Sequence, residues 1–302
     1  MMPRDDPSYG AHLTAGAAPL LVGLGIATSG LLVAYPPLIS QGARYLIGAV
    51  VLVIVLRRRA LPLQRHLPAR MLLLLVVDTV VGLGLFSVAT IEALRHGTAA
   101  GVGVVVGLAP LVIAAGTALA SRRGIPRALI TGTVIATMGA IVVNGAGSLA
   151  PAGLAWAVVA LASDATFTLV SAPLLRVLEP GELTTVSAAA AGIGLVAIGL
   201  ITGGVPPAPT VTETAADVAI ALAVTVGAFV LWFRGIHRLG VARAAPYVAL
   251  IPVGALVGGL ALHTTPIGPR PLVGVALVAI GLALAQWPRQ TGQRRRTPSM
   301  DV

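Results

Sequence analysis

Residues 69–91 read ARMLLLLVVDTVVGLGLFSVATI, an almost unbroken apolar run that carries a single acid, Asp78. A helix needs about 20 apolar residues to cross the roughly 30 Å hydrocarbon core of a bilayer. The run is continuous and does not alternate between apolar and polar residues, so it predicts a membrane-spanning helix and not a barrel strand.

Further apolar runs of the same kind fill most of the chain on either side. Hydrophobic residues make up 57% of the 302 residues and charged residues 10%, against roughly 25% charged residues in a soluble domain. The sequence therefore predicts an all-α membrane protein with ten transmembrane helices. The predicted spans are residues 19–35, 38–56, 69–91, 98–120, 125–145, 153–174, 183–201, 215–233, 241–262 and 271–287.

The basic residues fall almost entirely on one side of the predicted membrane. The chain has no lysine, so its 20 basic residues are all arginine. Seventeen of the 20 lie in loops and tails on one side, Arg95 and Arg270 lie on the other, and Arg44 lies within a span. Arginine-rich short loops stay in the cytoplasm. Both termini of this multi-pass protein are therefore predicted on the cytoplasmic side of the cytoplasmic (inner) membrane.

The composition argues against several classes of function. The formal charge of +10 does not indicate nucleic-acid binding, because the arginines act as insertion signals and no basic patch alternates with stacking aromatics. The chain has no cysteine, which removes disulfides and cysteine metal sites. It also lacks metalloprotease, nucleophile-elbow and phosphate-loop motifs. We expect no enzyme activity, cofactor or metal; the expected partners are the lipid bilayer and a small-molecule substrate, with the oligomeric state left open.

The chain contains an internal repeat. A shift of 142 residues superimposes several prolines and glycines, so spans one to five are predicted to recur as spans six to ten. The repeats cover residues 17–145 and 150–288, with tails at 1–16 and 289–302. A duplicated unit with an odd number of spans enters the membrane in opposite orientations, which predicts two inverted five-helix repeats. The matched pairs are Pro110 with Pro252, Gly116 with Gly258, Gly132 with Gly274, and Gly139 with Gly281.

Three short motifs accompany this arrangement, one early in the second span and one before each matched proline. They are Arg44-Tyr45-Leu46, residues 93–100 (ALRHGTAA) and residues 239–245 (LGVARAA). With ten spans, short loops and two halves, they resemble the EamA-type transporters of the drug/metabolite transporter superfamily over about residues 17–288. The resemblance implies a secondary transporter that moves a small organic metabolite, which can be amino-acid-like, by alternating access, most often in export.

Three ionisable residues inside the predicted spans are candidates for substrate or proton handling. Asp78 and Asp164 lie roughly 13 Å and 16 Å into their spans, near the midplane, and Arg44 lies roughly 9 Å deep. A charged aspartate at this depth costs about 2.5–3.5 kcal/mol on insertion scales, so it needs water, a cationic partner or a proton. A structural alternative stays open, in which Arg44 bridges an aspartate or a neutral aspartate bonds a backbone carbonyl.

Polar and kinked positions complete the candidate site. Thr28, Ser29 and Thr225 lie near mid-depth and are predicted to contact substrate, although hydroxyls there more often bond their own helix. Pro110 and Pro252 each remove a helix hydrogen bond and are predicted to form a kink or gate.

Two other functions stay open at this stage. In a small-drug efflux protein, the buried carboxylates would bind an organic cation. A non-transporting membrane scaffold would need long hydrophilic loops or interaction domains, which the sequence lacks.

Overall fold

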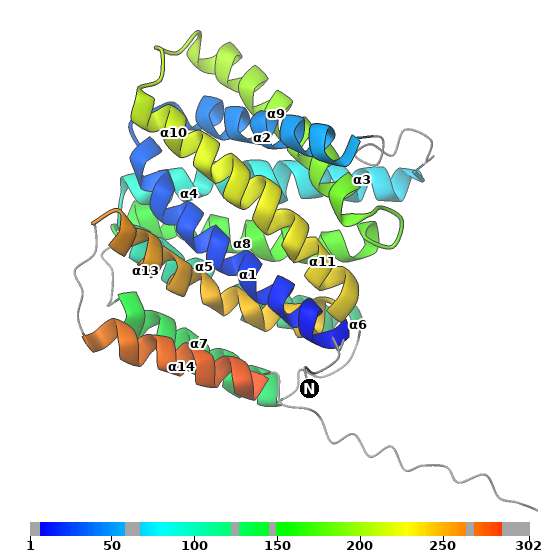
Figure 1. Cartoon of the computed structure of the whole chain (residues 1–302), viewed down its shortest axis with the longest axis vertical. Coiled ribbons are helices and arrows are strands. Elements are labelled where there is room, and N and C mark those ends of the chain that lie inside the picture. The colour runs from blue at the N-terminus through cyan, green and yellow to red at the C-terminus, as the bar shows by residue number, and fades with distance from the viewer. Residues whose placement is uncertain (1–6, 58–66, 122–126, 145–148, 264–268, 286–302) are drawn as a thin grey trace, which may run out of the picture.

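The computed structural model describes residues 7–57, 67–121, 127–144, 149–263 and 269–285. Within these ranges every regular element is a helix, and the isolated antiparallel bridge between Gly97 and Leu149 adds no strand. Figure 1 shows the helices lying side by side in one bundle. The prediction of an all-α membrane protein is confirmed. The predicted basic tail, residues 289–302, lies outside the described residues.

The first half of the chain contributes seven α-helices and two irregular helical segments to the described part of the structure. They are α1 (Pro7–Ser29), η1 (Gly30–Leu32), α2 (Pro37–Leu56), α3 (Ala69–Val77), η3 (Asp78–Leu85), α4 (Phe86–Arg95), α5 (Ala99–Val106), α6 (Ala109–Ser121) and α7 (Arg127–Asn144).

The second half follows the same sequence of long and broken helices. Its described elements are α8 (Pro151–Leu174), α9 (Pro180–Gly203), α10 (Val211–Ile220), η4 (Ala221–Ala228), α11 (Phe229–Leu239), α12 (Val241–Ala244), η5 (Ala245–Leu250), α13 (Ile251–Ala261) and α14 (Pro269–Ala285).

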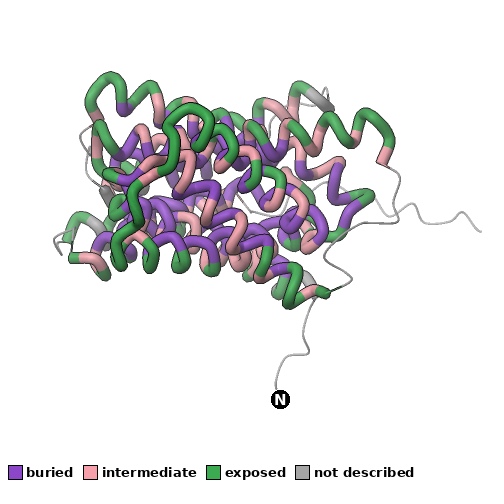
Figure 2. The backbone as a smooth tube through the Cα atoms, turned by 90° about the horizontal axis from the view of Figure 1, so that it is seen from above, coloured by how far each residue is buried: buried purple, intermediate pink, exposed green. Residues whose placement is uncertain are grey.

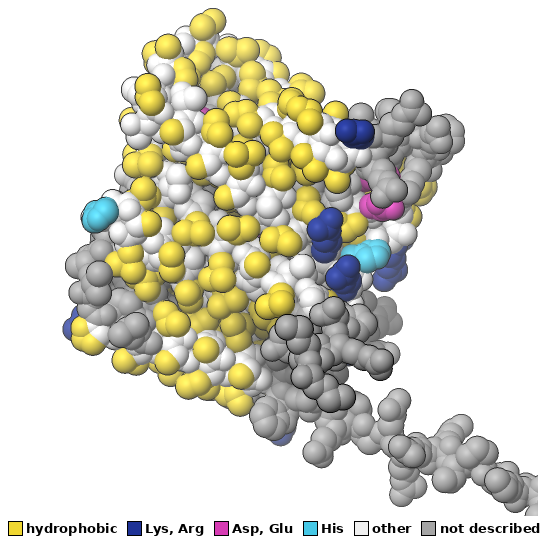
Figure 3. Space-filling model, viewed as in Figure 1, with side chains coloured by type: hydrophobic (Ala, Val, Ile, Leu, Met, Phe, Trp, Pro, Cys, Tyr) yellow, Lys and Arg dark blue, Asp and Glu magenta, His cyan; other side chains and the backbone are white. Residues whose placement is uncertain are grey.

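Eight helical stretches in the described part of the chain are long and apolar enough to cross a membrane. They correspond to eight of the ten predicted spans; α7 and α14, at the fifth and tenth positions, are not among them. The surface is apolar over most of the face seen in Figure 3, and most arginines in that view gather at one end of the helices. Large side chains such as Leu73 and Ile201 are 64% and 84% exposed, as expected for residues that contact lipid.

The buried core lies where the helices contact one another. Figure 2 shows buried residues running through the middle of the bundle, with exposed residues on its outside and at helix ends. Tyr45, Leu83 and Phe233 are among the largest side chains buried there. Small residues allow the helices to approach closely: a Cβ added to Gly132 would lie 2.5 Å from the carbonyl oxygen of Gly281, and the reverse contact has the same length.

The start of the first span differs from the prediction. Helix α1 begins at Pro7, within the segment predicted to be a tail, and Pro19 lies inside it. The prediction placed the start of the span at Pro19 because the residues before it form a short, more polar segment. Proline is tolerated inside membrane helices because neighbouring groups satisfy the freed carbonyl.

Both halves break their third and fourth long helices at matching places. The π-helical segments η3 and η4 each have eight residues, and η4 starts 143 positions after η3. Helices α6 and α13 begin 142 positions apart, at Ala109 and Ile251, each with proline as its second residue. Pro110 and Pro252 thus lie in the first turn of α6 and α13, and their role as a kink or gate stays a prediction.

The packing of helices also follows a reciprocal pattern. Helix α2 packs on α9, and α7 packs on α14, which pairs each of these helices with its counterpart 142 or 143 positions away. Figure 1 shows α7 and α14 side by side at one edge. Helix α1 packs on α13 and α11, and its counterpart α8 packs on α6 and α4. A two-fold relation between the halves would produce these contacts.

Candidate functional site

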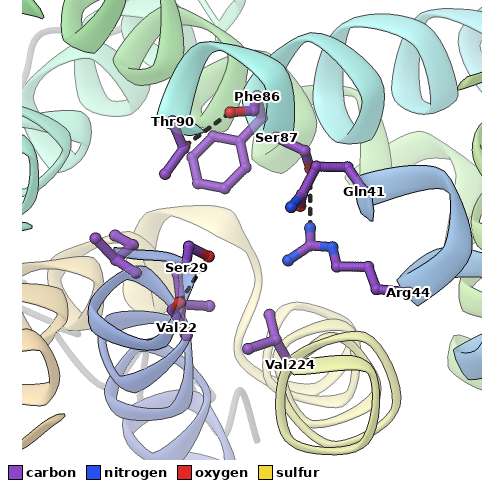
Figure 4. A pocket seen from close by; sticks show the side chains of 10 residues that line it. Val22, Ser29, Gln41, Arg44, Phe86, Ser87, Thr90 and Val224 are labelled. Atoms are coloured by element: carbon purple, nitrogen blue, oxygen red, sulfur yellow. Dashed lines mark hydrogen bonds between the residues drawn. The ribbon is translucent and has the colours of Figure 1, made fainter. Parts of the chain in front are cut away.

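A recess opens between α1, α2, α4 and η4. It holds about 280 Å³ of empty space, part of it open solvent. Figure 4 shows Arg44 and Gln41 on one side, Phe86 and Thr90 on a second, and Ser29 on a third. The recess therefore has a cationic wall, several polar groups and apolar surface between them. The lining residues are Val22, Gly25, Ile26, Ser29, Gln41, Arg44, Phe86, Ser87, Thr90 and Val224.

Arg44 is the charged group of this wall, and only 4% of the residue is exposed. Its Nη2 donates to the Tyr45 hydroxyl and to Ser87 Oγ, both at 2.8 Å. Its guanidinium carbon lies 4.5 Å from the centre of the Tyr45 ring. Its Nε is buried and has no hydrogen-bond partner. The described part of the chain shows no ion pair between Arg44 and a carboxylate, so the interhelical bridge considered from sequence is absent there.

The position of Arg44 is fixed by hydroxyls. Tyr45 Oη and Ser87 Oγ lie 2.6 Å apart. Tyr45 Oη donates to the Leu83 carbonyl at 3.1 Å, and Ser87 Oγ to the same oxygen at 2.8 Å. This network joins α2 to the helix that follows η3 and leaves the guanidinium facing the recess.

Asp217 lies near this wall but does not contact Arg44 directly. Its Oδ1 accepts a hydrogen bond from Ser40 Oγ at 3.0 Å, and Gln41 Nε2 donates to Ser40 Oγ at 3.2 Å. The Arg44 charge attracts the Asp217 carboxylate electrostatically. Asp217 is 7% exposed, so the two charges share a buried environment without forming a hydrogen-bonded pair.

Asp78 forms a separate cluster, which we call the Asp78 clasp: Asp78, Ser171 and Ser187. Asp78 is fully buried. Its Oδ1 accepts from Ser171 Oγ at 3.3 Å and its Oδ2 from Ser187 Oγ at 2.8 Å. Ser171 Oγ also contacts the Phe167 carbonyl. The clasp joins η3 to α8 and α9.

Aromatic rings pack beside the clasp. Phe167 lies 5.4 Å from Phe229 and 5.2 Å from Phe233, measured between ring centroids. A Cβ added to Gly82 would lie 3.0 Å from the Phe167 Cβ. These separations lie in the favourable range for aromatic pairs, so this region is filled by side chains.

Asp164 lies on α8, and one of its carboxylate oxygens has no hydrogen-bond partner among the described residues. The residue is half-buried, and its Oδ2 is fully buried with no hydrogen bond. It does not meet Arg44 or Asp78. The structure therefore separates the two aspartates that sequence analysis considered together.

Comparisons with known proteins point to one family. Residues 151–287 match the model of the EamA-like transporter family. The chain carries an EamA-like transporter domain. This match, together with the apolar helices, supports a multi-pass membrane protein and bears out the resemblance seen in the sequence for residues 151–287.

One protein relative and one solved structure match most of the chain. A protein described as the uncharacterized transporter YetK, from Bacillus subtilis (strain 168), is 25% identical over 286 residues, which cover 90% of this chain and 86% of the relative. A solved crystal structure, titled only as the crystal structure of a protein, has a TM-score of 0.72 and 23% identity. The match covers 91% of this chain and 96% of that one, so the two proteins share a fold.

The remaining predicted polar residues of this EamA-like chain occupy less distinctive places. Thr28 donates to the Leu24 carbonyl at 2.9 Å and Ser29 to the Gly25 carbonyl at 2.8 Å. Both hydroxyls thus bond their own helix, although Ser29 also lines the recess. Thr225 is fully buried and its hydroxyl has no partner. No group of three or more metal-ligating side chains occurs among the described residues.

Sequence reasoning missed several residues that complete both clusters. Tyr45, Ser87 and Asp217 surround Arg44, whereas Ser171 and Ser187 bond Asp78. Asp217 carried a usable signal, because an acid within a predicted span is costly. The serines carried none, because serine is common in membrane helices and only packing reveals which helix it faces.

Proposed function

We propose that this protein is a secondary transporter that moves a small organic metabolite across the cytoplasmic membrane by alternating access, in the direction of export. The EamA-like domain and the transporter relative support the transport function. Export follows from what the family resemblance most often implies. No nucleotide-binding motif appears in the sequence, so a gradient of an ion or of the substrate would supply the energy.

The proposed architecture is ten spans in two inverted repeats with cytoplasmic termini. The reciprocal helix contacts, the equal spacing of η3 and η4, and the matched prolines support it. Helices α7 and α14 would be the fifth and tenth spans. Transporters with inverted repeats place their substrate near the midplane between the halves, where rocking of one half exposes the site to either side.

The single observation that carries the proposal is the recess beside Arg44. Helices of the first half supply nine of its lining residues, and Val224 of the second half supplies the tenth. Movement of η4 against α1 and α2 would therefore open or close the recess. Ser29 ends α1 and Gln41 lies in the first turns of α2, so the recess faces the side predicted from the arginine bias to be outside.

A counterflow experiment in liposomes tests this function. Purified protein would be reconstituted, loaded with pooled unlabelled metabolites, and scored for uptake of each labelled compound against protein-free vesicles. Gly25→Leu should reduce uptake at least about tenfold, a barrier increase of about 1.4 kcal/mol, because a Cβ at Gly25 already lies 2.5 Å from Val224 Cγ2.

A matched substitution provides the control. Gly194 also lies in a long helix, but nothing lies within 4 Å of its added Cβ. Gly194→Leu should retain counterflow. Equal uptake by both variants would contradict the proposed site. Failure of the wild-type protein to exchange any compound would contradict the proposed function.

The topology has its own test. Reporters active only in the periplasm or only in the cytoplasm would be fused in turn after Gln286. The arginine bias predicts strong cytoplasmic activity. Strong periplasmic activity at that position would overturn the ten-span topology.

A second candidate function, efflux of an organic cation, is favoured by one observation. Asp164 presents a buried carboxylate oxygen without a partner, and a cationic substrate would satisfy it. The same counterflow screen distinguishes metabolite export from organic-cation efflux. Exchange of organic cations that is lost on substitution of Asp164, but not on substitution of Gly25, would support efflux through Asp164.

A further inference from the structure

We propose that the recess beside Arg44 binds a carboxylate group of the transported molecule, with the apolar part of that molecule against Val22, Ile26 and Phe86. The inference rests on the proposed transport function and names the chemical class of its substrate. It follows from the one charged side chain in the lining and from the hydrogen-bonding capacity that remains on it.

The Arg44 guanidinium has unused donor capacity. Arginine has five N–H donors in a planar fork, and Nη2 supplies the two hydrogen bonds that Arg44 makes, to Tyr45 and Ser87. Nε is buried without a partner. Nη1 makes no hydrogen bond among the described residues and is not among the buried unpartnered atoms, so it is the donor that a ligand in the recess would use.

The charge at this position also lacks a bonded counterion. No ion pair involving Arg44 is present among the described residues, and the nearby Asp217 accepts its hydrogen bond from Ser40 instead. Asp217 balances Arg44 at longer range but does not occupy its donors. A buried cation that faces a solvent-accessible recess is a favourable site for an anion.

The geometry favours a carboxylate over a phosphate. A carboxylate carries one charge, which the single Arg44 cation balances, and it can accept a charge-assisted hydrogen bond from the guanidinium. A phosphate carries nearly two charges at neutral pH, and the recess has a single cation in its lining. The other polar lining groups are hydroxyls and an amide: Ser29, Gln41, Ser87 and Thr90. The remaining wall is apolar, so the bound molecule would be a carboxylate with a hydrophobic body.

A matched set of probes tests the assignment by thermal stabilisation of the purified full-length protein in detergent. The probes are 4-methylpentanoate, leucine, leucinamide and 3-methylbutylamine, which share a branched aliphatic body, together with inorganic phosphate. A ligand that binds only the folded state raises Tm in proportion to its affinity and concentration. The two carboxylates should raise Tm, whereas the amide, the amine and phosphate should not.

Substitution of Arg44 locates the effect. Arg44→Gln should weaken carboxylate binding at least about tenfold, as expected when a charge-assisted hydrogen bond is lost. Arg234→Gln, at an exposed arginine of α11, is the matched control and should leave the stabilisation unchanged. Because Arg44→Gln also removes two hydrogen bonds, Arg44→Lys serves as a second variant; it keeps the charge and should retain carboxylate selectivity at reduced affinity.

The outcomes separate this inference from the proposed function. Stabilisation by carboxylates that depends on Arg44, in a protein that exchanges nothing in liposomes, would support the binding site and contradict transport. Exchange of the amine or amide without any response to carboxylates would support transport and overturn the carboxylate assignment. Stabilisation by phosphate alone, or carboxylate selectivity that persists in Arg44→Gln, would also overturn it.

Discussion

Two regions of the molecule, the recess beside Arg44 and the Asp78 clasp, include residues at matching positions of the two halves. The recess contains empty space, whereas the region around the clasp is filled by side chains. Ser171 of the clasp follows Ser29 of the recess by 142 positions, and Ser187 follows Arg44 by 143. In the recess the charge lies on α2 and borders the empty space, although Arg44 itself is only 4% exposed. In the clasp the charge lies on η3 and is enclosed by two hydroxyls.

The side chains around these groups account for the difference in volume. Gly25 lines the recess, and Phe167, 142 positions later, packs beside the clasp. Thr90 lines the recess, and Phe233, 143 positions later, stacks on Phe167. Two phenylalanines thus stand where the recess has a glycine and a threonine. At these matched positions the two regions differ in openness because they differ in side-chain volume.

The largest expected effect concerns Asp164. This residue lies 142 positions after Val22 of the recess, so the second half has an acid where the first half has an apolar side chain. If Asp164 handles the proton that drives transport, Asp164→Asn should abolish accumulation driven by a pH gradient in vesicles. Exchange at equal pH should persist, because binding and rocking do not need that proton.

Protein abundance is the control for Asp164→Asn, since lower abundance would indicate a structural role. Wild-type accumulation with unchanged pH dependence, at normal abundance, would contradict the coupling role.

The second prediction compares the accessibility of the recess and of the clasp to a reagent in solution. The chain contains no cysteine, so Ser29→Cys and Ser171→Cys each create a single reactive thiol. A membrane-impermeant maleimide added from outside should label position 29, which lines the recess and is 4% exposed, faster than position 171, which is fully buried. Labelling measured by mass shift in whole cells, with labelling after denaturation as the control, distinguishes the sites. Equal labelling of both would remove the contrast between an open and a filled region.

The third prediction compares the two regions by stability. Phe233→Ala should lower the free energy of unfolding by about 3–5 kcal/mol, because it leaves a cavity among packed rings. Thr90→Ala, at the corresponding position of the recess, should cost less than about 1.5 kcal/mol, because its hydroxyl bonds only its own helix. Unfolding in mixed micelles with increasing denaturing detergent gives both values. Similar losses would mean that the two regions are packed alike.

The smallest expected effect is the coupling between Asp78 and Ser187. A double-mutant cycle with Asp78→Asn and Ser187→Ala should yield an interaction energy of about 1–2 kcal/mol, in the range for directly bonded residues. Asp217 and Ser40, which are joined by a hydrogen bond beside the recess, provide the comparison pair. Additive losses for Asp78 and Ser187 would show that the clasp does not hold the helices together.

Much of the fold follows from local sequence. The apolar runs predict the helices because an unpaired backbone group in lipid is costly, and Pro110 and Pro252 predict the interruptions where α6 and α13 begin. Arg44 and Asp78 could be identified as candidate residues because a charge within a span has few stable environments. Helix α1 was missed before Pro19, because a polar N-terminal sequence resembles a tail until it packs on other helices.

The sequence alone determined which segments form membrane helices, which residues are costly in lipid, and which punctuating residues repeat, because these depend on composition and spacing along one segment. Only the tertiary structure decided which side chains meet. Asp78 is bonded by serines 93 and 109 positions away, and Arg44 by a serine 43 positions away. Nothing local distinguishes those serines from others, because the partner of a side chain is set by the rotation and crossing of helices that pack together. The same packing leaves empty space at Gly25 and fills the corresponding place with Phe167.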